Sequence, residues 1–237
     1  MDKRGYVLDL GQIDYGEAWE LQHHLWSERV QGKLPDLLLL LEHSHVITLG
    51  RRGDRSHLLI SPDALKAMGV PLYHIERGGD VTYHGPGQLV AYPILDLKGY
   101  GYRVVQYIEQ LEEVVLRVLK DFGIEGRRDP LNRGVWVNQA KIASVGVAIK
   151  RWVSFHGIAL NYETDLKYFE TMNPCGLEGI EMTSMAKILG VRIPRKDLVD
   201  QFSFHFKEIF EREWEEKDLS EILSEHPMEP RDPVDAN

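Results

Sequence analysis

Apolar residues recur every three or four positions in two long runs, and this spacing places them on one face of an α-helix. The first run comprises Val104, Ile108, Leu111, Val115 and Leu119, and the second Leu198, Phe202, Phe206 and Ile209. Two further helices are indicated by their end signals. Asp14 followed by Glu17 is a capping box, and Ser61-Pro62 with Gly69 has the order N-cap, first-turn proline and C-terminal glycine.

Strands are predicted where aliphatic, β-branched and aromatic residues cluster between turn signals. These segments are residues 6–10, 37–41, 46–49, 134–137, 141–149 and 153–161. The last three are separated only by short turns, so we expect them to form an antiparallel meander. Because strands and helices do not alternate strictly, we expect an α+β fold in which helices pack on a mixed, largely antiparallel sheet.

The length of 237 residues fits one large domain, which we place at residues 1–217. Residues 218–237 differ in composition, with Pro227, Pro230 and Pro233 and six acidic residues against one basic residue. Such a segment buries little apolar surface. We therefore expect an acidic, mobile C-terminal tail after one short helical turn.

The net charge of −9 makes nucleic acid an unexpected ligand, and an acidic protein partner would need a local basic patch. Two arginine clusters provide candidates for such a patch. They are Arg51, Arg52 and Arg55, and Arg127, Arg128 and Arg133. Ordinary solvated loop charge is the alternative interpretation of both clusters.

The chain has one cysteine, which excludes an intrachain disulfide and a zinc site with several cysteine ligands. Its first residues hold no apolar stretch of the signal-peptide type. The longest purely aliphatic run, residues 37–41, is far shorter than the ~20 residues that span a bilayer. We therefore expect a cytoplasmic protein with no membrane partner.

A glycine-rich segment at residues 77–88 carries the densest group of candidate binding residues. Its sequence is Arg-Gly-Gly-Asp-Val-Thr-Tyr-His-Gly-Pro-Gly-Gln. The glycines allow close approach of a ligand to the backbone, and Arg77, Thr82, His84 and Gln88 supply polar groups. The spacing fits neither a P-loop nor a dinucleotide fingerprint. Two tight turns between strands are the alternative interpretation.

Small side chains gather on one face of the predicted hairpin at residues 141–161. If Lys150 and Arg151 form the turn, Ser144 pairs with Gly157 and Ile142 with Ala159. Ile142, Ser144, Gly146 and Ala148 then share a face, because side chains alternate along a strand. Such a face either lines a shallow channel for an extended acyl chain or packs tightly against a helix.

The only cysteine lies in the sequence Asn173-Pro174-Cys175-Gly176. Proline and glycine on its two sides predict a turn, in which the sulfur would be accessible. A free thiol titrates near ~8.5, so a nearby cation is needed to form much thiolate at neutral pH. A buried small apolar role is the alternative for a lone cysteine.

These motifs together resemble the lipoyl(octanoyl) transferase family, whose members move an octanoyl group from acyl carrier protein to a lysine of a lipoyl domain. The resemblance extends over about residues 37–185 and includes the glycine-rich segment, Lys-Ile-Ala, Phe-His-Gly-x-Ala-Leu-Asn and Asn-Pro-Cys-Gly, in that order. It implies that residues 1–217 form the catalytic domain. It also implies the fold of the biotin and lipoate protein ligase catalytic domain.

The resemblance implies Cys175 as the nucleophile and Lys141 as its partner; without it, Lys141 would be taken for a solvent-facing residue after a turn. It also implies three substrate-contacting segments. They are Arg77, Gly78, Gly79, Asp80, Val81, Thr82, Tyr83 and His84, then Ser144, Val145 and Gly146, and then Gly157, Ile158 and Ala159.

The implied reaction passes an octanoyl group through a thioester on Cys175. The donor is octanoyl-acyl carrier protein, and the acceptors are lipoyl domains of 2-oxoacid dehydrogenases and the glycine cleavage H protein. No cofactor and no ATP are required. Lys141 has two candidate roles, as an ammonium that favours the thiolate or as a neutral amine that takes a proton from the acceptor lysine.

Several candidates remain outside this catalytic pair. His84 and His156 are candidates for donating hydrogen bonds to the acyl oxygen. No third metal-ligating residue follows or precedes His43 and His45 at a spacing typical of metal sites, so no metal is expected. We expect Arg51, Arg52 and Arg55 to dock the carrier. The alternative functions are an ATP-dependent lipoate or biotin ligase on the same scaffold, and a non-catalytic acyl-binding module.

Overall fold

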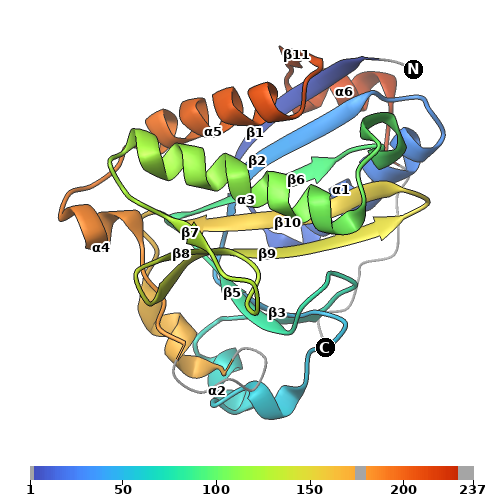
Figure 1. Ribbon diagram of the computed structural model, residues 1–237. Helices are drawn as coiled ribbons and strands as arrows, with labels where there is room; N and C mark the ends of the chain where they lie inside the picture. Colours follow the sequence, from blue (N-terminus) through green and yellow to red (C-terminus); the bar gives the residue numbers. More distant parts are fainter. Residues whose placement is uncertain (1–2, 174–179, 229–237) are drawn as a thin grey trace.

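A computed structural model describes residues 3–173 and 180–228 (Figure 1). The helices are α1 (Tyr15–Val30), α2 (Pro62–Ala67), α3 (Val104–Asp121), α4 (Met185–Leu189), α5 (Arg195–Ile209) and α6 (Leu219–Glu225). The strands are β1 (Arg4–Ile13), β2 (Asp36–His43), β3 (Val46–Leu49), β4 (Leu72–His74), β5 (Val81–His84), β6 (Gln88–Ile94), β7 (Arg127–Arg128), β8 (Val135–Val137), β9 (Ala140–Lys150), β10 (Val153–Asn161) and β11 (Glu213–Glu216). Three short 3₁₀ turns are η1 (Arg55–His57), η2 (Leu97–Tyr100) and η3 (Leu166–Thr171).

The large sheet has the strand order β11-β1-β2-β6-β10-β9-β8-β7. Strand β1 runs parallel to both of its neighbours, and the pairs from β2 to β7 are antiparallel. Helices cover the sheet, so the predicted α+β class with a mixed, largely antiparallel sheet is confirmed. Strands β8, β9 and β10 form the predicted meander.

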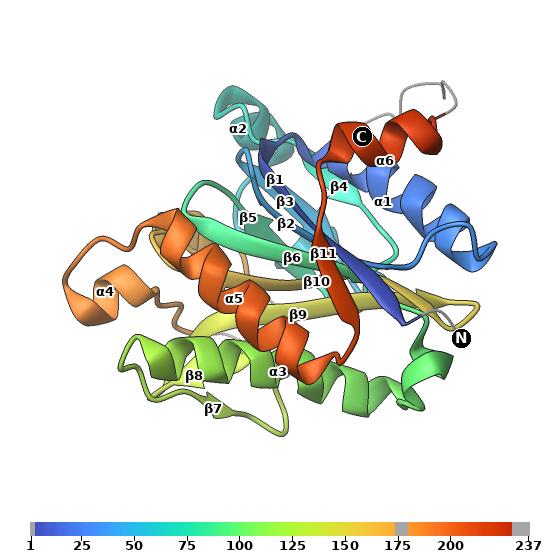
Figure 2. The ribbon, with the colours of Figure 1, turned by 90° about the horizontal axis from the view of Figure 1, so that it is seen from above.

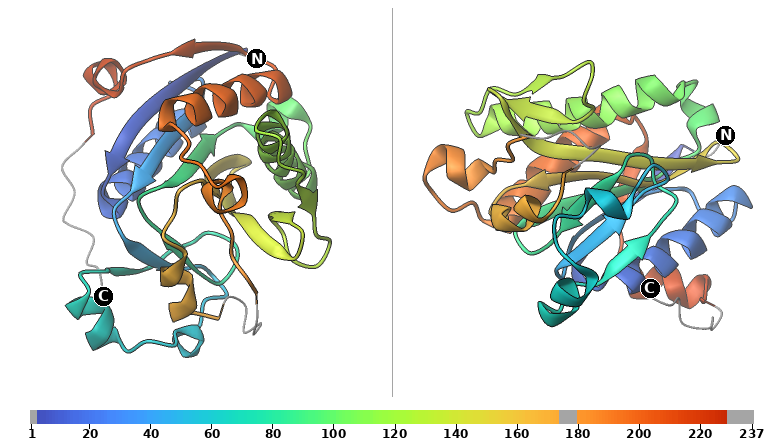
Figure 3. Two further views of the ribbon diagram at one scale, coloured as in Figure 1. Left: turned by 90° about the vertical axis from the view of Figure 1, so that its left-hand side faces the viewer. Right: turned by 90° about the horizontal axis from the view of Figure 1, so that it is seen from below.

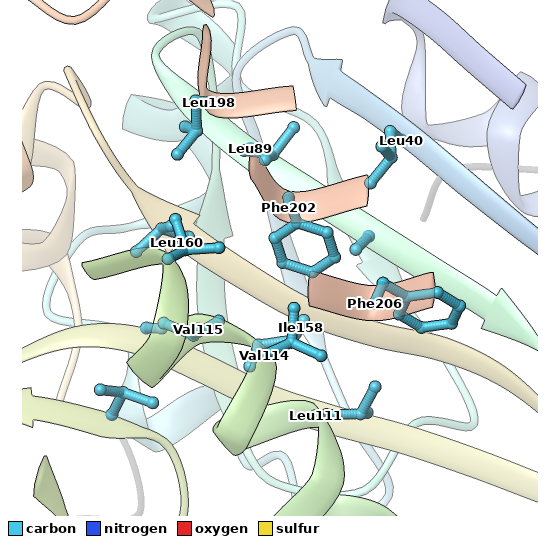
Figure 4. Close-up of a cluster of buried hydrophobic side chains, with 14 of the residues drawn as sticks. Leu40, Leu89, Leu111, Val114, Val115, Ile158, Leu160, Leu198, Phe202 and Phe206 are labelled. Carbon is cyan, nitrogen blue, oxygen red and sulfur yellow. The ribbon is translucent and has the colours of Figure 1, made fainter. Parts of the chain in front are cut away.

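Strand β2 explains why its sequence is an unbroken aliphatic run. Leu38 and Leu40 belong to one core cluster together with residues of α3 and α5. Leu37, Leu39 and Leu41 point to the other face, in a cluster with residues of α1 and α6. Because both faces are covered, every position from Leu37 to Leu41 is apolar. Figure 2 shows α3 and α5 side by side, and Figure 4 shows their side chains over strands β2, β6 and β10.

The end signals of the early helices act as the sequence predicts, with one difference. Ser61 accepts a hydrogen bond from the backbone N–H of Ala64, and Pro62 opens α2. Asp14 caps α1, but its carboxylate accepts from the N–H of Gly16 and not from that of Glu17. The N-cap is therefore present in a tighter form than a capping box.

A three-stranded sheet, β4-β3-β5, continues part of the large sheet. Strand β3 follows β2 after two residues, and β5 precedes β6 by three, so the antiparallel pair β2–β6 bends into the pair β3–β5. Figures 1 and 3 show this small sheet together with α2 at one end of the molecule. The bend needs glycine: Gly87 has φ +76°, and a Cβ on Gly85 would overlap the Tyr83 hydroxyl.

The hairpin β9–β10 forms in a different register from the predicted one. Arg151 and Trp152 make the turn, both with positive φ, and Lys150 pairs with Val153. Ser144 therefore pairs with Ala159, and Gly146 with Gly157. Side chains alternate along a strand with period two, so this change by two positions keeps Ser144 and Gly146 on the predicted face.

Residues 218–228 are the described part of the tail expected at residues 218–237; they pack on the core, and the short helical turn expected there is helix α6. Asp218 and Glu221 form a capping box at the start of α6. Ile222 is buried in the same cluster as α1 and strand β2. His226 accepts a hydrogen bond from His24 through its backbone oxygen and contacts Glu28. The apolar residues of this segment occur at helical spacing, and their burial fixes residues 218–228 to the core.

Replacement of Leu40 by alanine tests the double burial of strand β2. Leu40 is 0% exposed, so the change leaves a cavity under α5, and we expect a loss of about 2–5 kcal/mol in the free energy of unfolding. Urea denaturation measures it. Leu131→Ala is the matched control, because this leucine is 89% exposed and its loss should cost less than about 0.5 kcal/mol. Equal losses in the two variants would contradict the proposed packing.

Candidate active site

A cavity of about 180 Å³ lies over strands β9 and β10, between them and the glycine-rich segment. Its rim carries the exposed residues Arg52 and Leu131 and the half-buried residues Arg133, Ile180 and Met182. Its buried wall carries Tyr15, His84, Val90, Tyr92 and His156. A cavity of this size is below the ~300–1,000 Å³ of sites for drug-sized ligands, and it suits a short, slender group.

The structure brings most of the sequence-predicted site residues around this cavity. The lining includes Lys141, Arg77, Gly79, Asp80, Val81, Thr82, His84, Ser144, Val145, Gly146, Gly157, Ile158 and Ala159. Gly78 and Tyr83 lie behind this wall. The N–H of Gly78 donates to the Val147 oxygen, and Tyr83 is fully buried and stacked on Tyr168. Cys175 lies outside the described residues.

The glycine-rich segment forms strand β5 with a turn at each end, so part of the alternative interpretation, tight turns, is also present. Gly79 has φ +90°. The segment rests directly on β9, because a Cβ on Gly146 would lie 2.9 Å from the Gly78 oxygen. The small residue at position 146 is thus required by the packing of this loop as well as by the cavity. Ile142 departs from the predicted face and belongs to the main core.

Arg77 holds the glycine-rich loop in shape. It is 7% exposed, and its guanidinium donates to the backbone oxygens of Thr48 at 2.8 Å, Asp80 at 2.7 Å and Gly78 at 3.0 Å. A buried cation is costly unless hydrogen bonds satisfy it. These carbonyl contacts satisfy it and tie the loop to strand β3.

Asp80 connects the same loop to the chain just before the Asn-Pro-Cys-Gly motif. Its carboxylate contacts the His57 ring at 2.7 Å. The backbone oxygen of His57 accepts a hydrogen bond from the N–H of Asn173, and Leu58 pairs with Met172. The entry to the motif is therefore fixed beside the cavity by backbone and side-chain contacts.

The chain beyond the motif is fixed to Lys141. The N–H of Lys141 donates to the Glu181 oxygen at 2.8 Å, and the Thr183 N–H donates to the Lys141 oxygen at 2.9 Å. The Lys141 Nζ lies 5.7 Å from the centre of the Trp136 ring. Strand β9 thus joins Lys141 to a segment about 40 residues away in sequence, which local sequence patterns could not reveal.

The buried histidines in and behind this wall are uncharged: His84 and His156 line the cavity, and His43 is hydrogen-bonded to the lining residue Tyr92. The Nδ1 of His43 donates to the Ile13 oxygen, so its Nε2 accepts from the Tyr92 hydroxyl at 2.7 Å. The Nδ1 of His84 contacts the Gln88 Oε1, which is an acceptor. Burial lowers the pKa of His43 to about 4, and it also lowers the pKa of His84 and of His156. These rings act as uncharged hydrogen-bonding groups.

Tyr15 and Tyr92 are lining residues that the sequence analysis missed. Tyr15 follows the N-cap of α1, and Tyr92 lies within β6, a strand that was not predicted. Neither has a chemical motif around it. Only the packing of α1 on β6 and β10 brings the two side chains to the cavity.

The described residues, 3–173 and 180–228, contain no group of three side chains that could hold a metal ion. His43 and His45 are engaged separately, His43 with Tyr92 and His45 with the Tyr83 hydroxyl at 2.7 Å. Within the same residues, no helix is long and apolar enough to cross a membrane.

Comparison with known proteins identifies the class to which this fold and cavity belong. The sequence matches the lipoyl protein ligase A/B catalytic domain over residues 14–207, and the chain belongs to this family. Its relatives include proteins named octanoyltransferase. That of Syntrophobacter fumaroxidans is 51% identical over 222 residues, which cover 94% of this chain and 97% of the relative. That of Solibacter usitatus is 50% identical over 204 residues, which cover 86% and 92%.

Solved structures confirm the fold expected from the motifs. Lipoate-protein ligase A bound with ATP superimposes with a TM-score of 0.71 at 16% identity, over 95% of this chain and 92% of that one. A bi-partite lipoate protein ligase from Thermoplasma acidophilum gives 0.69 at 14% identity, over 95% and 90%. At these identities the likeness concerns the fold alone.

The lowered histidine pKa values predict how stability depends on pH. An unfolded histidine titrates near 6.5, whereas folded His43 titrates at about 4. Between these values the unfolded chain binds more protons, so the free energy of unfolding falls as the pH falls from 6.5 towards 4. His43 alone accounts for about 3 kcal/mol of this loss.

Urea denaturation at several pH values measures this slope, and NMR of the imidazole protons assigns it to individual rings. A folded-state titration of His43 near 6.5 would contradict its burial as a neutral ring.

Proposed function

We propose that this protein is an octanoyltransferase that moves an octanoyl group from acyl carrier protein to a lysine of a lipoyl domain, through a thioester on Cys175. The name shared by its relatives supports the acyltransferase activity. The observation that carries the proposal here is the cavity: Lys141 lies in its lining and is bonded to the chain after the Asn-Pro-Cys-Gly motif, and the chain before the motif is held by His57, which contacts the lining residue Asp80. The acceptors are lipoyl domains of 2-oxoacid dehydrogenases and the glycine cleavage H protein.

The reaction has two steps that share one carbonyl carbon. The Cys175 thiolate attacks the octanoyl thioester, a new carbon–sulfur bond forms, and the carrier's phosphopantetheine leaves as a thiol after taking a proton. The acceptor lysine then attacks the enzyme thioester, the amide forms, and the cysteine is released. One thioester replaces another in the first step, and amide formation drives the second without ATP.

Lys141 acts on the first step as a cation in this proposal. Its Nζ faces the Trp136 ring, a contact that favours a positive charge. A cation near the cysteine lowers the free energy of the thiolate relative to the thiol. The side chain also packs on the backbone of Gly134, since a Cβ there would lie 2.7 Å from the Lys141 Cε. Lys141 therefore has little room to move away from the rim.

Some of the predicted substrate-binding residues form the walls around the acyl chain, and others hold the glycine-rich loop in place. The glycine-rich loop and the strand segments Ser144–Gly146 and Gly157–Ala159 form the two walls between which the acyl chain lies. Their small side chains leave space for an extended hydrocarbon, and each buried methylene contributes roughly 0.8 kcal/mol to binding. Arg77 and Asp80 support the chain indirectly by holding the loop.

Intact-mass spectrometry with octanoyl-acyl carrier protein tests the covalent route. Wild-type protein should gain the mass of one octanoyl group, and Cys175→Ala should gain none. Because the chain has one cysteine, the site of a hydroxylamine-sensitive gain is unambiguous. Lys141→Met should slow acylation by about 10²-fold or more, because the thiolate then loses its cation.

The alternatives give different results in the same experiment. Transfer that continues at the normal rate in Cys175→Ser and requires ATP would support a ligase on this scaffold. Absence of any acyl-enzyme and of any transfer would support an acyl-binding module. Either result would reject the proposed mechanism.

The two arginine clusters differ in their suitability for docking an acidic carrier. Arg128 and Arg133 pair with acidic residues of α3, and Arg127 pairs with Asp129. Within the described part of the chain, the side chains of Arg51 and Arg52 have no hydrogen bond or ion pair. Arg52 also stands on the cavity rim. We therefore place the docking surface at Arg51 and Arg52, with Arg55 nearby on η1.

Charge reversal tests this surface. Arg51→Glu/Arg52→Glu should raise the KM for the acylated carrier by roughly 5- to 30-fold, about 1–2 kcal/mol, and leave kcat within about twofold. Lys98→Glu/Lys120→Glu is the matched control. It changes the net charge equally at two exposed lysines on η2 and α3. The effect should also weaken with salt, and equal KM values for the two variants would reject the surface.

A further inference from the structure

Glu112 is a buried carboxylate that the proposed mechanism does not use. It is 0% exposed and shares the buried face of helix α3 with Leu111 and Val115. A buried charged group is costly unless hydrogen bonds and opposite charges satisfy it. The contacts that hold a carboxylate at this position, where the helix pattern favours an apolar residue, therefore indicate what Glu112 does.

The contact specific to Glu112 is a hydrogen bond to the chain that leads into strand β8. The backbone N–H of Gly134 donates to its Oε1 at 2.8 Å. Its Oε2 lies 3.4 Å from the Arg128 Nε and 3.7 Å from an Arg133 guanidinium nitrogen. Both arginines also pair with a second glutamate of α3. The hydrogen bond to Gly134 is thus the contact that the neighbouring glutamates do not duplicate.

Gly134 passes this contact on to strand β9. Its φ of +124° lies in the region that favours glycine. A Cβ here would overlap the backbone oxygen of Ala143 and would lie 2.7 Å from the Lys141 Cε. Gly134 is therefore bonded to α3 through its N–H and packed directly against β9. Figure 2 shows β8 and β9 beside α3, and both strands contact this helix.

Strand β9 has a bulge at this point, and the bulge sets the direction of Lys141. Val135 and Trp136 are consecutive on β8. Their partners on β9 are Ala143 and Lys141, so Ile142 is an extra residue. Ile142 and Ala143 both belong to the main core. Regular alternation from Ala143 would turn Lys141 to the core side as well. The extra residue turns it to the opposite side, where it lines the cavity.

We propose that Glu112 is a positioning residue, which holds Gly134 against the bulge of β9 and thereby fixes the direction in which Lys141 presents its ammonium to the cavity. This inference rests on the proposed acyl transfer. Without the hydrogen bond, the start of β8 can move away from β9, and the bulge no longer has a fixed geometry. An ammonium displaced from the thiol stabilises the thiolate less, so the thiol pKa rises.

Two conservative replacements separate the hydrogen bond of Glu112 from its charge. Glu112→Gln keeps an oxygen acceptor at the same reach and removes the charge. Glu112→Asp keeps the charge and is one methylene shorter, so its oxygens draw back from the Gly134 N–H.

The measurement is the rate at which iodoacetamide alkylates Cys175, followed as a function of pH. In Glu112→Asp we expect the thiol to titrate about one unit higher and to react about tenfold more slowly at neutral pH, because less thiolate is present. Glu112→Gln should stay within about threefold of wild type, since its acceptor is kept. Equal rates in the two variants, or the opposite order, would reject the proposal.

A double variant shows whether Glu112 acts through Lys141. Lys141→Met removes the ammonium, so no cation is left for Glu112 to position. We expect Lys141→Met/Glu112→Asp to react within about twofold of Lys141→Met alone. A further loss of about tenfold in the double variant would reveal a general structural effect and would reject the positioning role.

Asp36→Asn is the matched control for the loss of a buried carboxylate. Asp36 is 2% exposed, accepts the backbone N–H of Asp96 and pairs with Arg29, and it does not line the cavity. Its replacement should lower stability in urea denaturation and leave the alkylation rate of Cys175 equal to that of wild type. A slower rate in this control would show that destabilisation alone changes the thiol.

The two proposals fail in different ways. Wild-type protein that forms no acyl-enzyme with octanoyl-acyl carrier protein would reject the proposed function. Normal acylation of the wild type, with Glu112→Asp reacting as fast as Glu112→Gln, would reject the role of Glu112 alone.

Discussion

The backbone pairing of strand β9 is the interaction on which the site depends. Along its length β9 pairs with β10, and at its first residues it pairs with Glu181–Thr183. This arrangement places Lys141 at the point where the large sheet meets the chain that follows the cysteine motif. It also presents Ser144 and Gly146 to the glycine-rich loop. Loss of this pairing would separate Lys141, the proposed partner of the cysteine, from the rest of the proposed site.

Uncharged polar groups are the second physical feature of the cavity. Desolvation keeps His43, His84 and His156 neutral, and carbonyl contacts neutralise the cost of burying Arg77. A hydrocarbon chain is compatible with neutral, hydrogen-bonded walls but not with bare charges. The charged side chains of Arg52, Arg133 and Lys141 lie at the rim, where the proposed function brings in the protein partners.

The elements that were predicted correctly are those with a recognisable periodicity or end signal within their own residues. The apolar runs of α3 and α5, the cap of α2 and the aliphatic run of β2 were identified because each follows from helix or strand periodicity. Strands β4, β7 and β11 were missed because they are short and depend on their neighbours. The hairpin register differs from the predicted one because Arg151 and Trp152 form the turn with positive φ. This conformation usually requires glycine, and the turn contains none.

The sequence by itself determined the family and the α+β class, and it supplied Lys141, Cys175 and the glycine-rich loop as predicted site residues, because these are encoded in contiguous motifs. Tertiary structure alone decided that Tyr15, Tyr92 and His156 share one wall, that the side chains of Arg51 and Arg52 have no partner among residues 3–173 and 180–228, and that residues 218–228 pack on the core. These facts depend on contacts between segments far apart in the chain. The free energy that stabilises these contacts comes from burying side chains of distant segments against one another, so no short stretch of sequence predicts it.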